Sequence, residues 1–160
     1  MNHRAYIALG ANLGDPASVV RSALAALAEL PATRLVAASS LYRTAPVGLV
    51  NQPDFINAVA GVDTTLTAPA LLTALFSIEA DFGRIRQQKN GPRRLDLDLL
   101  LYDDLLLDTP ELVLPHPRLH LRAFVLAPLA EIAPDLVIPG RGSVAAWLPA
   151  VAHQAIARLP

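Results

Sequence analysis

The stretch Leu95–Tyr102, LDLDLLLY, decides the fold, because it has the pattern of a buried β-strand and yet carries two carboxylates. Side chains alternate along a strand, so Asp96 and Asp98 share one face, with Cα atoms about 6.6 Å apart. The leucines between and beside them share the other face. We predict that these leucines pack against helices, while both aspartates face a common point on the opposite side of the sheet.

The segments before this strand predict alternating strands and helices. A strand at about residues 5–9 runs into a glycine-flanked turn, and Asp15 and Pro16 are typical of a helix start. Two further strands are expected within 33–48 and 54–66, followed by a helix that Thr67 caps and Gly83 ends. The order strand, helix, strand, strand, helix, strand is the split βαβ pattern of an α+β sandwich, in which helices pack on one face of an antiparallel sheet.

Composition limits the classes of protein that the chain can belong to. It has 160 residues, of which 53% are hydrophobic, so we expect one domain over 1–160, with the segment from Asp103 onward as a C-terminal elaboration. A formal net charge of -1 argues against a nucleic-acid partner. With no cysteine, no signal-peptide pattern and no run near the roughly 20 apolar residues of a membrane span, we expect a cytoplasmic protein with no membrane partner. We also expect it to be a monomer.

The two aspartates need a positive partner, because like charges this close repel. Mg²⁺ suits the pair, since it is commonly held by one or two carboxylates together with substrate phosphates. Five basic residues lie between Arg84 and Arg94, and Arg93 is well placed to contact such phosphates. The spacing alone leaves an alternative open, in which the aspartates form a solvated strand face paired with surface arginines.

Two other segments carry candidate binding residues. The stretch RTAPVGLVNQPDFINAV places an aromatic ring, Phe55, near the amide of Asn57, which suits a flat heteroaromatic ligand. Burial of Phe55 in the core is the plainer alternative. Since the chain has no phosphate-binding glycine loop, side chains must hold any phosphate, and the segment from His116 to Arg122 is a candidate second basic wall.

The run from Lys89 to Leu100, K-x-G-P-R-x-x-D-L-D-L-L, resembles the signature of the 6-hydroxymethyl-7,8-dihydropterin pyrophosphokinases of folate biosynthesis. Five other segments resemble the same family in the same order: AYIALGANLGDP, SSLYRTAPVG, NQPDFINAV, ADFGRIR and LPHPRLHLRAFVLAPLAEIAPDLVIP. The resemblance implies a ferredoxin-like fold. It also implies transfer of the β,γ-pyrophosphate of ATP to the hydroxymethyl oxygen of the dihydropterin, with release of AMP.

The resemblance also implies roles for individual residues on the ATP side. Asp96 and Asp98 would hold two Mg²⁺ ions, and together with Arg84 and Arg93 they would form the catalytic group. The residues implied to bind ATP are Glu79, Arg84, Arg93, His116 and Arg122.

On the pterin side, the resemblance implies a ring held between two aromatic side chains and read along its edge. The residues implied are Phe55 and Phe124 as the sandwich, with Thr44, Val47, Gly48 and Asn57 along the edge. We expect in-line attack of the pterin hydroxyl on the β-phosphorus, with Asp98 as the nearby proton acceptor. Two alternatives remain: a catalytically silent pterin- or nucleotide-binding module, and a phosphotransferase acting on another flat alcohol.

Overall fold

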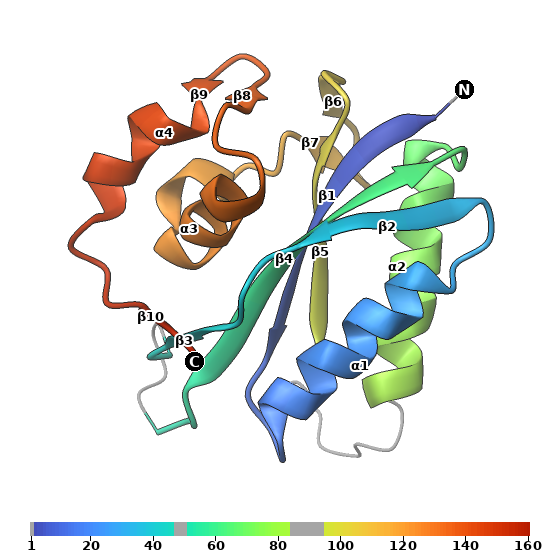
Figure 1. Ribbon diagram of the computed structural model, residues 1–160. Helices are drawn as coiled ribbons and strands as arrows, with labels where there is room; N and C mark the ends of the chain where they lie inside the picture. The colour runs from blue at the N-terminus through green and yellow to red at the C-terminus, as the bar shows by residue number, and fades with distance from the viewer. Residues whose placement is uncertain (1, 47–50, 84–94) are drawn as a thin grey trace.

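The computed structural model describes residues 2–46, 51–83 and 95–160 (Figure 1). The first part of the chain forms β1 (His3–Ala11), α1 (Pro16–Ala28), β2 (Thr33–Ala38), β3 (Tyr42–Thr44), β4 (Phe55–Thr64), α2 (Ala68–Gly83) and β5 (Asp96–Tyr102). The remainder forms β6 (Leu107–Asp108), β7 (Val113–Leu114), the 3₁₀ helix η1 (Leu119–Leu121), α3 (Ala123–Ile132), β8 (Val137–Ile138), β9 (Gly142–Ser143), α4 (Val144–Trp147), the 3₁₀ helix η2 (Leu148–Val151) and β10 (Ala157–Arg158).

The main sheet has the strand order β10-β3-β4-β1-β5, and β2 also pairs with β4. Every pairing in it is antiparallel, and β1 lies between β4 and β5. Each of the two strand–helix–strand units therefore has another strand inserted between its own two strands, which is the split βαβ arrangement. The predicted α+β, ferredoxin-like fold is confirmed.

Two strand boundaries differ from the prediction. The expected single strand within 33–48 is two strands, because Ser39 bonds to β4 through its backbone N–H and through its hydroxyl, which accepts from Val59 N at 2.9 Å. The first strand does not end at Leu9 but continues to Ala11, because Gly10 pairs with Asn57 on one side and with Asp96 on the other. Sheet pairing, which no local pattern reveals, sets both boundaries.

Helices α1 and α2 cover one face of the sheet. Asp15 caps α1 by accepting from Ser18 N at 3.3 Å, and Thr67 caps α2 by accepting from Ala70 N at 3.2 Å, as predicted. The core on this face contains the predicted leucines of the LDLDLLLY stretch together with residues of both helices: Leu95, Leu97, Leu99, Val20, Leu27, Leu71, Leu75 and Ile78.

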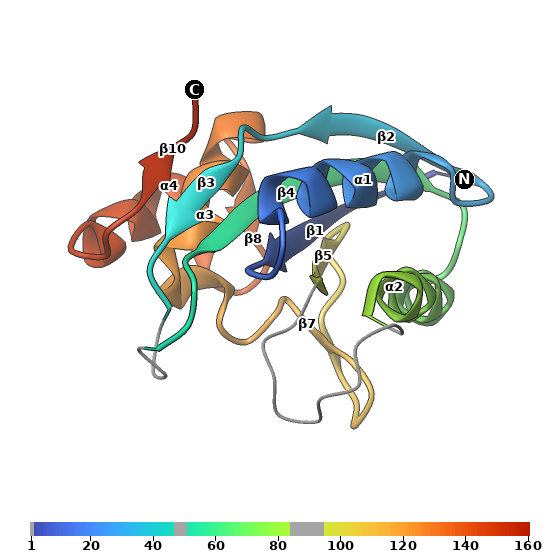
Figure 2. The ribbon, with the colours of Figure 1, turned by 90° about the horizontal axis from the view of Figure 1, so that it is seen from below.

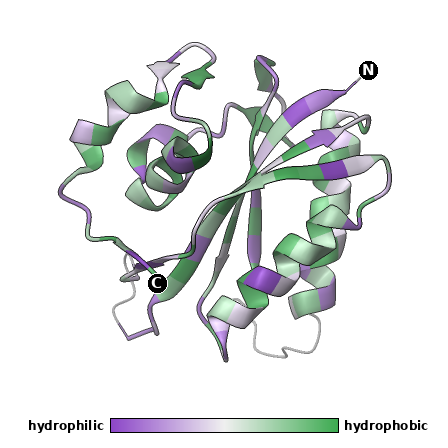
Figure 3. Ribbon diagram, in the orientation of Figure 1, coloured by the Kyte–Doolittle hydropathy of each residue, from purple (hydrophilic) through white to green (hydrophobic). Residues whose placement is uncertain are grey.

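The C-terminal segment covers part of the opposite face. α3 and α4 lie on the other side of the strands from α2 in both views (Figures 1 and 2). Both helical layers carry mainly apolar residues (Figure 3). The second core joins sheet residues to this layer: Tyr6, Ala8, Val59, Leu100 and Leu101 with Leu126, Leu129, Ile138 and Val144. Within 2–46, 51–83 and 95–160, no helix is long and apolar enough to cross a membrane.

Candidate active site

A cleft of about 580 Å³ opens between the sheet and the start of α3. Strand β1 supplies its floor, and residues from β3, β4, β5, α3 and the segment before β10 surround it. The lining residues are Ala8, Leu9, Gly10, Thr44, Ala45, Pro46, Phe55, Asn57, Asp96, Asp98, Leu121, Arg122, Ala123, Phe124, Gln154 and Ala155. Seven of the predicted site residues, far apart in sequence, therefore meet in one cleft.

The register of the strands explains the shape of the floor. Asn57, Gly10 and Asp96 form one row across three strands, and Ala8 lies opposite Asp98 in the next turn of the pleat. Paired residues of an antiparallel sheet project from the same face. Because the central strand carries only a hydrogen atom or a methyl group there, the floor stays open between the amide and the two carboxylates.

Asp96 and Asp98 are both half-buried and line this cleft. The leucines that alternate with them lie in the opposite core, which is the division of faces that the sequence predicts. Asp98 also influences its neighbours, since its charge acts to raise the pKa of both His116 and Arg122. The carboxylate of Asp98 thus lies within electrostatic reach of two basic residues that the sequence assigned to the same site.

The aromatic and amide residues also meet at the cleft. Phe55 and Phe124 are partly exposed and line it, and Phe55 belongs to neither core, so the plainer interpretation of Phe55 as a core residue is wrong. Asn57 is 5% exposed, and its Nδ2 donates to Thr44 Oγ1 at 2.8 Å. That hydrogen bond fixes the Asn57 amide, so its polar edge has a defined direction beside the rings.

Gly10 is the reason that the Asn57 amide fits. A Cβ atom added at Gly10 would lie 2.9 Å from Asn57 Oδ1, closer than real Cβ contacts. Any side chain at this position would displace the amide. The sequence signal was present in ALGAN, but the glycine was interpreted as part of a turn.

His116 lies beside the outer edge of β5, where its backbone N donates to Leu100 O at 2.9 Å. Burial lowers the pKa of His116, with Arg122 and Arg118 adding to the effect, while the charge of Asp98 opposes it. His116 Nδ1 accepts from Arg118 N at 3.1 Å, so the neutral ring carries its proton on Nε2. The imidazole is therefore a neutral donor at the edge of the site.

Arg122 connects the aromatic and acidic parts of the cleft. Its guanidinium carbon lies 5.3 Å from the centroid of the Phe124 ring, within cation–π range. Burial and the nearby Arg118 lower the pKa of Arg122, whereas Asp98 acts to raise it. Arg122 stays charged at neutral pH, because guanidinium groups in proteins do not deprotonate.

Glu79, on α2, supports β5, the strand that carries the two aspartates. Its Oε2 accepts from Leu97 N at 2.8 Å, on the edge of β5 that does not pair with β1. Leu97 lies between the two aspartates, so this bond from α2 holds the strand that carries them. Glu79 and His116 do not line the cleft itself but flank β5 at its outer edge.

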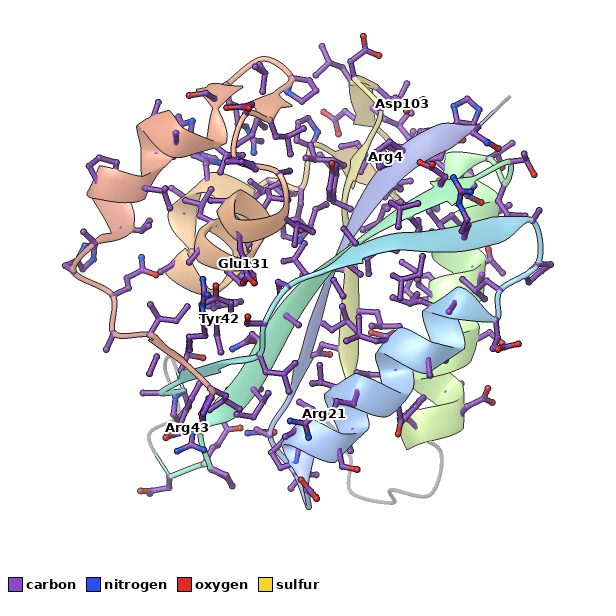
Figure 4. The ribbon with its side chains drawn as sticks, viewed as in Figure 1. Arg4, Arg21, Tyr42, Arg43, Asp103 and Glu131 are labelled. Carbon is purple, nitrogen blue, oxygen red and sulfur yellow. The ribbon has the colours of Figure 1, made fainter. Side chains whose placement is uncertain are left out.

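A second polar cluster joins α3 to the strand beside the cleft (Figure 4). Glu131 accepts from Tyr42 Oη at 2.6 Å, from Ser40 Oγ at 2.8 Å and from Ser40 N at 3.0 Å. Although burial acts to raise the pKa of Glu131, these hydrogen bonds outweigh it and lower that pKa. The cluster fixes the far end of α3, the helix that carries Phe124 in its first turn.

Four predicted residues lie outside the described residues: Arg84, Arg93, Val47 and Gly48. The structure adds cleft residues that the sequence did not indicate, chiefly Gly10, Leu121, Gln154 and Ala155. Leu121 lies within a segment that resembles the family but was given no role, whereas Gln154 and Ala155 belong to no recognisable motif. The position of all three depends on how the C-terminal segment folds back across the sheet.

Comparison with known proteins identifies the family. A family model described as 7,8-dihydro-6-hydroxymethylpterin-pyrophosphokinase (HPPK) matches residues 6–134, which include the floor, the aromatic residues and the paired aspartates. The chain belongs to the HPPK family. The family resemblance found in the sequence is thus confirmed.

Individual HPPK relatives match over most of their length. The chain is 48% identical over 160 residues to the 2-amino-4-hydroxy-6-hydroxymethyldihydropteridine pyrophosphokinase of Pseudomonas aeruginosa, covering 100% of this chain and 99% of that protein. It is 50% identical over 137 residues to the protein of the same name from Methylorubrum extorquens, covering 86% and 87% of the two chains.

A solved structure shows the same fold at lower identity. The crystal structure of Plasmodium falciparum HPPK-DHPS wild type with pteroate superposes with a TM-score of 0.70 at 14% identity, over 94% of this chain and 42% of that one. The present chain thus spans less than half of that longer protein, and the similarity concerns the fold alone.

Proposed function

We propose that this protein transfers the pyrophosphoryl group of ATP to the hydroxymethyl group of 6-hydroxymethyl-7,8-dihydropterin, releasing AMP, as a step of folate biosynthesis. Membership of the HPPK family carries the reaction type. The observation in this structure that supports it best is the single cleft in which an aromatic and amide wall meets two carboxylates. No observation favours the alternative of a catalytically silent binding module.

The pterin would bind at the aromatic end of the cleft. Phe55 and Phe124 offer faces for stacking, and Asn57 offers an amide that Thr44 holds in place. The Oδ1 atom of Asn57 remains directed towards the space above Gly10. An N–H group on the ring edge would find its acceptor there. Val47 and Gly48 are proposed to contribute further backbone groups to the pterin edge, as the family resemblance implies.

The two aspartates fit a magnesium site. In the described part of the chain no group of three or more His, Cys, Asp or Glu side chains could hold a metal ion, whereas Asp96 and Asp98 meet at the cleft. Mg²⁺ retains waters and is commonly held by one or two carboxylates plus phosphates, so two protein carboxylates suffice. We propose that the pair holds two Mg²⁺ ions with ATP, and bound Mg²⁺ would neutralise phosphate charge and polarise the pterin hydroxyl.

The basic residues would orient the triphosphate. Arg122 presents a charged guanidinium over the Phe124 ring and within electrostatic reach of Asp98, where it would contact phosphate oxygens next to the pterin. His116 would donate from Nε2 as a neutral hydrogen-bond donor. Arg84 and Arg93 are proposed to complete this group, and Glu79 supports the nucleotide side by holding Leu97.

The reaction is an in-line displacement at the β-phosphorus. The hydroxymethyl oxygen forms a bond to that phosphorus, the bond to the oxygen bridging the α- and β-phosphates breaks, and AMP leaves with the bonding electron pair. The hydroxyl proton passes to the carboxylate of Asp98. This residue lies on the same face of the sheet as Asn57, whose amide is proposed to bind the pterin. Apart from this proton transfer, the chain contributes positioning and charge stabilisation, which is what phosphoryl transfer requires.

Three broader properties belong to the same proposal. Residues 1–160 are proposed to form a single domain, because the C-terminal layer shares a core with the central sheet. The protein is proposed to act as a cytoplasmic monomer without a nucleic-acid or membrane partner.

The deciding experiment measures AMP release from ATP and Mg²⁺, with and without 6-hydroxymethyl-7,8-dihydropterin. Wild type is compared with Asp98→Asn and with a matched control, Asp104→Asn, whose side chain is exposed in the turn after β5. We expect pterin-dependent AMP from wild type and from the control, and a loss of at least about 100-fold in Asp98→Asn, because charge stabilisation at the site is lost.

The product and the acceptor separate the remaining possibilities. Formation of ADP in place of AMP, or turnover with other flat alcohols but not with the pterin, would show a different phosphotransferase. Absence of any pterin-dependent product from folded wild type would contradict the proposed function. Normal turnover by Asp98→Asn would contradict the role of the aspartate pair.

A further inference from the structure

Gln154 reaches the cleft from a segment that lies beyond the residues matched by the family model. Its side-chain amide makes two hydrogen bonds to the backbone. Oε1 accepts from Ala123 N at 2.8 Å, and Nε2 donates to Leu121 O at 2.9 Å. These two backbone groups belong to the residues before and after Arg122, so the Gln154 amide holds the backbone on both sides of that residue.

The start of α3 needs such a partner. The first N–H groups of a helix have no intrahelical acceptor, and they are usually satisfied by a short polar side chain at the N-cap. Here the N-cap is Arg122, whose side chain makes no capping hydrogen bond and has no acceptor atom to offer. Gln154 supplies the missing acceptor to Ala123 N from 31 residues further along the chain.

Gln154 is itself held on both sides along the chain. Its own backbone N donates to Val151 O at 3.0 Å, and Val151 is 5% exposed in the second core. After it, β10 pairs with β3, and Leu159 N donates to Leu41 O at 2.8 Å. The segment between these anchors therefore carries Gln154 on a fixed path across the end of α3.

Two side chains of this backbone segment, Arg122 and Phe124, belong to the proposed active site. Arg122 lies directly between the two bonded backbone groups, and Phe124 follows one residue later. The Arg122 guanidinium already rests over the Phe124 ring and lies in the field of Asp98. A shift of the backbone at Leu121 or Ala123 would therefore move a phosphate-binding group and a pterin-stacking ring together.

We propose that Gln154 is a positioning residue that holds Arg122 and Phe124 in their binding geometry by capping α3 and fixing the Leu121 carbonyl. This inference rests on the proposed function, because it assigns Gln154 an effect on both ATP and pterin. Gln154 acts through the backbone and takes no part in the chemical step.

The test compares two substitutions with a matched control. Gln154→Met keeps the length of the side chain and removes both hydrogen bonds, whereas Gln154→Glu keeps the acceptor for Ala123 N and removes the donor to Leu121 O. The control is His153→Ala, which removes an exposed neighbouring side chain. For each protein, KM for ATP, KM for pterin, kcat and the melting temperature are measured, together with calorimetric binding of the non-reactive analogue α,β-methylene-ATP.

We expect Gln154→Met to raise KM for both substrates about tenfold, which corresponds to 1.4 kcal/mol of binding free energy, with a smaller change in kcat. Gln154→Glu should lower the melting temperature less than Gln154→Met does, because Ala123 N keeps its acceptor, and still weaken analogue binding severalfold. His153→Ala should match wild type throughout. A purely structural role would lower the melting temperature of Gln154→Met while leaving both KM values unchanged at a temperature where the variant is folded.

The results separate this inference from the proposed function. If wild type makes pterin-dependent AMP and both Gln154 variants keep KM values and analogue binding within twofold of wild type, the positioning role is wrong while the function stands. If wild type makes no such AMP, the proposed function fails. A difference in analogue binding between wild type and Gln154→Met would then still support a role of Gln154 in positioning the cleft residues. Should Gln154→Met fail to fold, Gln154→Glu carries the test through KM for the uncharged pterin, because the new carboxylate repels a triphosphate but not the pterin.

Discussion

Gly10→Ala tests how the floor of the cleft is built. Gly10 lies within a regular strand, between Asn57 and Asp96 on the neighbouring strands. The new methyl group would meet Asn57 Oδ1 at 2.9 Å, so the amide must move. We expect weaker pterin binding, because the group proposed to read the pterin edge would leave its position.

The magnitude follows from what Asn57 loses. The side chain is 5% exposed and donates to Thr44 Oγ1 at 2.8 Å, and breaking such a buried hydrogen bond costs about 1–3 kcal/mol. Replacing glycine by alanine restricts the unfolded chain and offsets about 0.4–1 kcal/mol of this. The net loss is up to about 2.6 kcal/mol in unfolding free energy. It lowers the melting temperature by up to about 10 °C. A lost pterin contact of about 1.4–2.8 kcal/mol raises KM for pterin about 10–100-fold.

The assay measures AMP release at varied pterin and varied ATP, at a temperature where every variant is folded. The matched control is Gly61→Ala in β4, where the added Cβ would meet the ring of Tyr6 at 3.2 Å, in the packed part of the sheet outside the cleft lining. We expect the control to keep the wild-type KM for pterin. A Gly10→Ala protein with wild-type KM for pterin would refute the reasoning, as would an equal loss for ATP and pterin in both variants.

Two further predictions concern Glu131. Glu131→Ala should lower the unfolding free energy by about 1–3 kcal/mol in urea denaturation, because the Tyr42 hydroxyl and the Ser40 N–H lose their acceptor. The control Glu29→Ala, at an exposed position, should stay within about 0.5 kcal/mol of wild type. Equal stability of the two variants would contradict this. The pKa of Glu131 is lowered on folding from an ordinary value of 4.5, so the unfolded chain binds more protons and this contribution is lost as the pH falls below about 4.5. Glu131→Gln should therefore show a shallower fall in stability between pH 6 and pH 3 in the same denaturation experiment, and an unchanged slope would show that the carboxylate is not stabilised by folding.

The sequence alone determined much of the fold, because its signals are local. The period of two in Leu95–Leu99 assigned Asp96 and Asp98 to one face and the three leucines of that stretch to the other, and the structure shows that division. The helices were found from their caps and apolar stripes, and the order of elements was enough for the split βαβ arrangement. The family was recognised from six segments in order. Each strand, cap and family segment is recognised from neighbours within a few residues along the chain, and their order along the chain supplied the rest.

The tertiary structure decided which residues share a space. Gly10 matters because strand pairing places it opposite Asn57, Glu131 matters because α3 returns to Ser40 and Tyr42, and Gln154 matters because the C-terminal segment crosses the start of α3. Strand pairing also continued β1 beyond Leu9, where the sequence predicted a turn. No spacing in the sequence encodes these contacts, since they join residues 31 to 91 positions apart that meet only after the chain has folded.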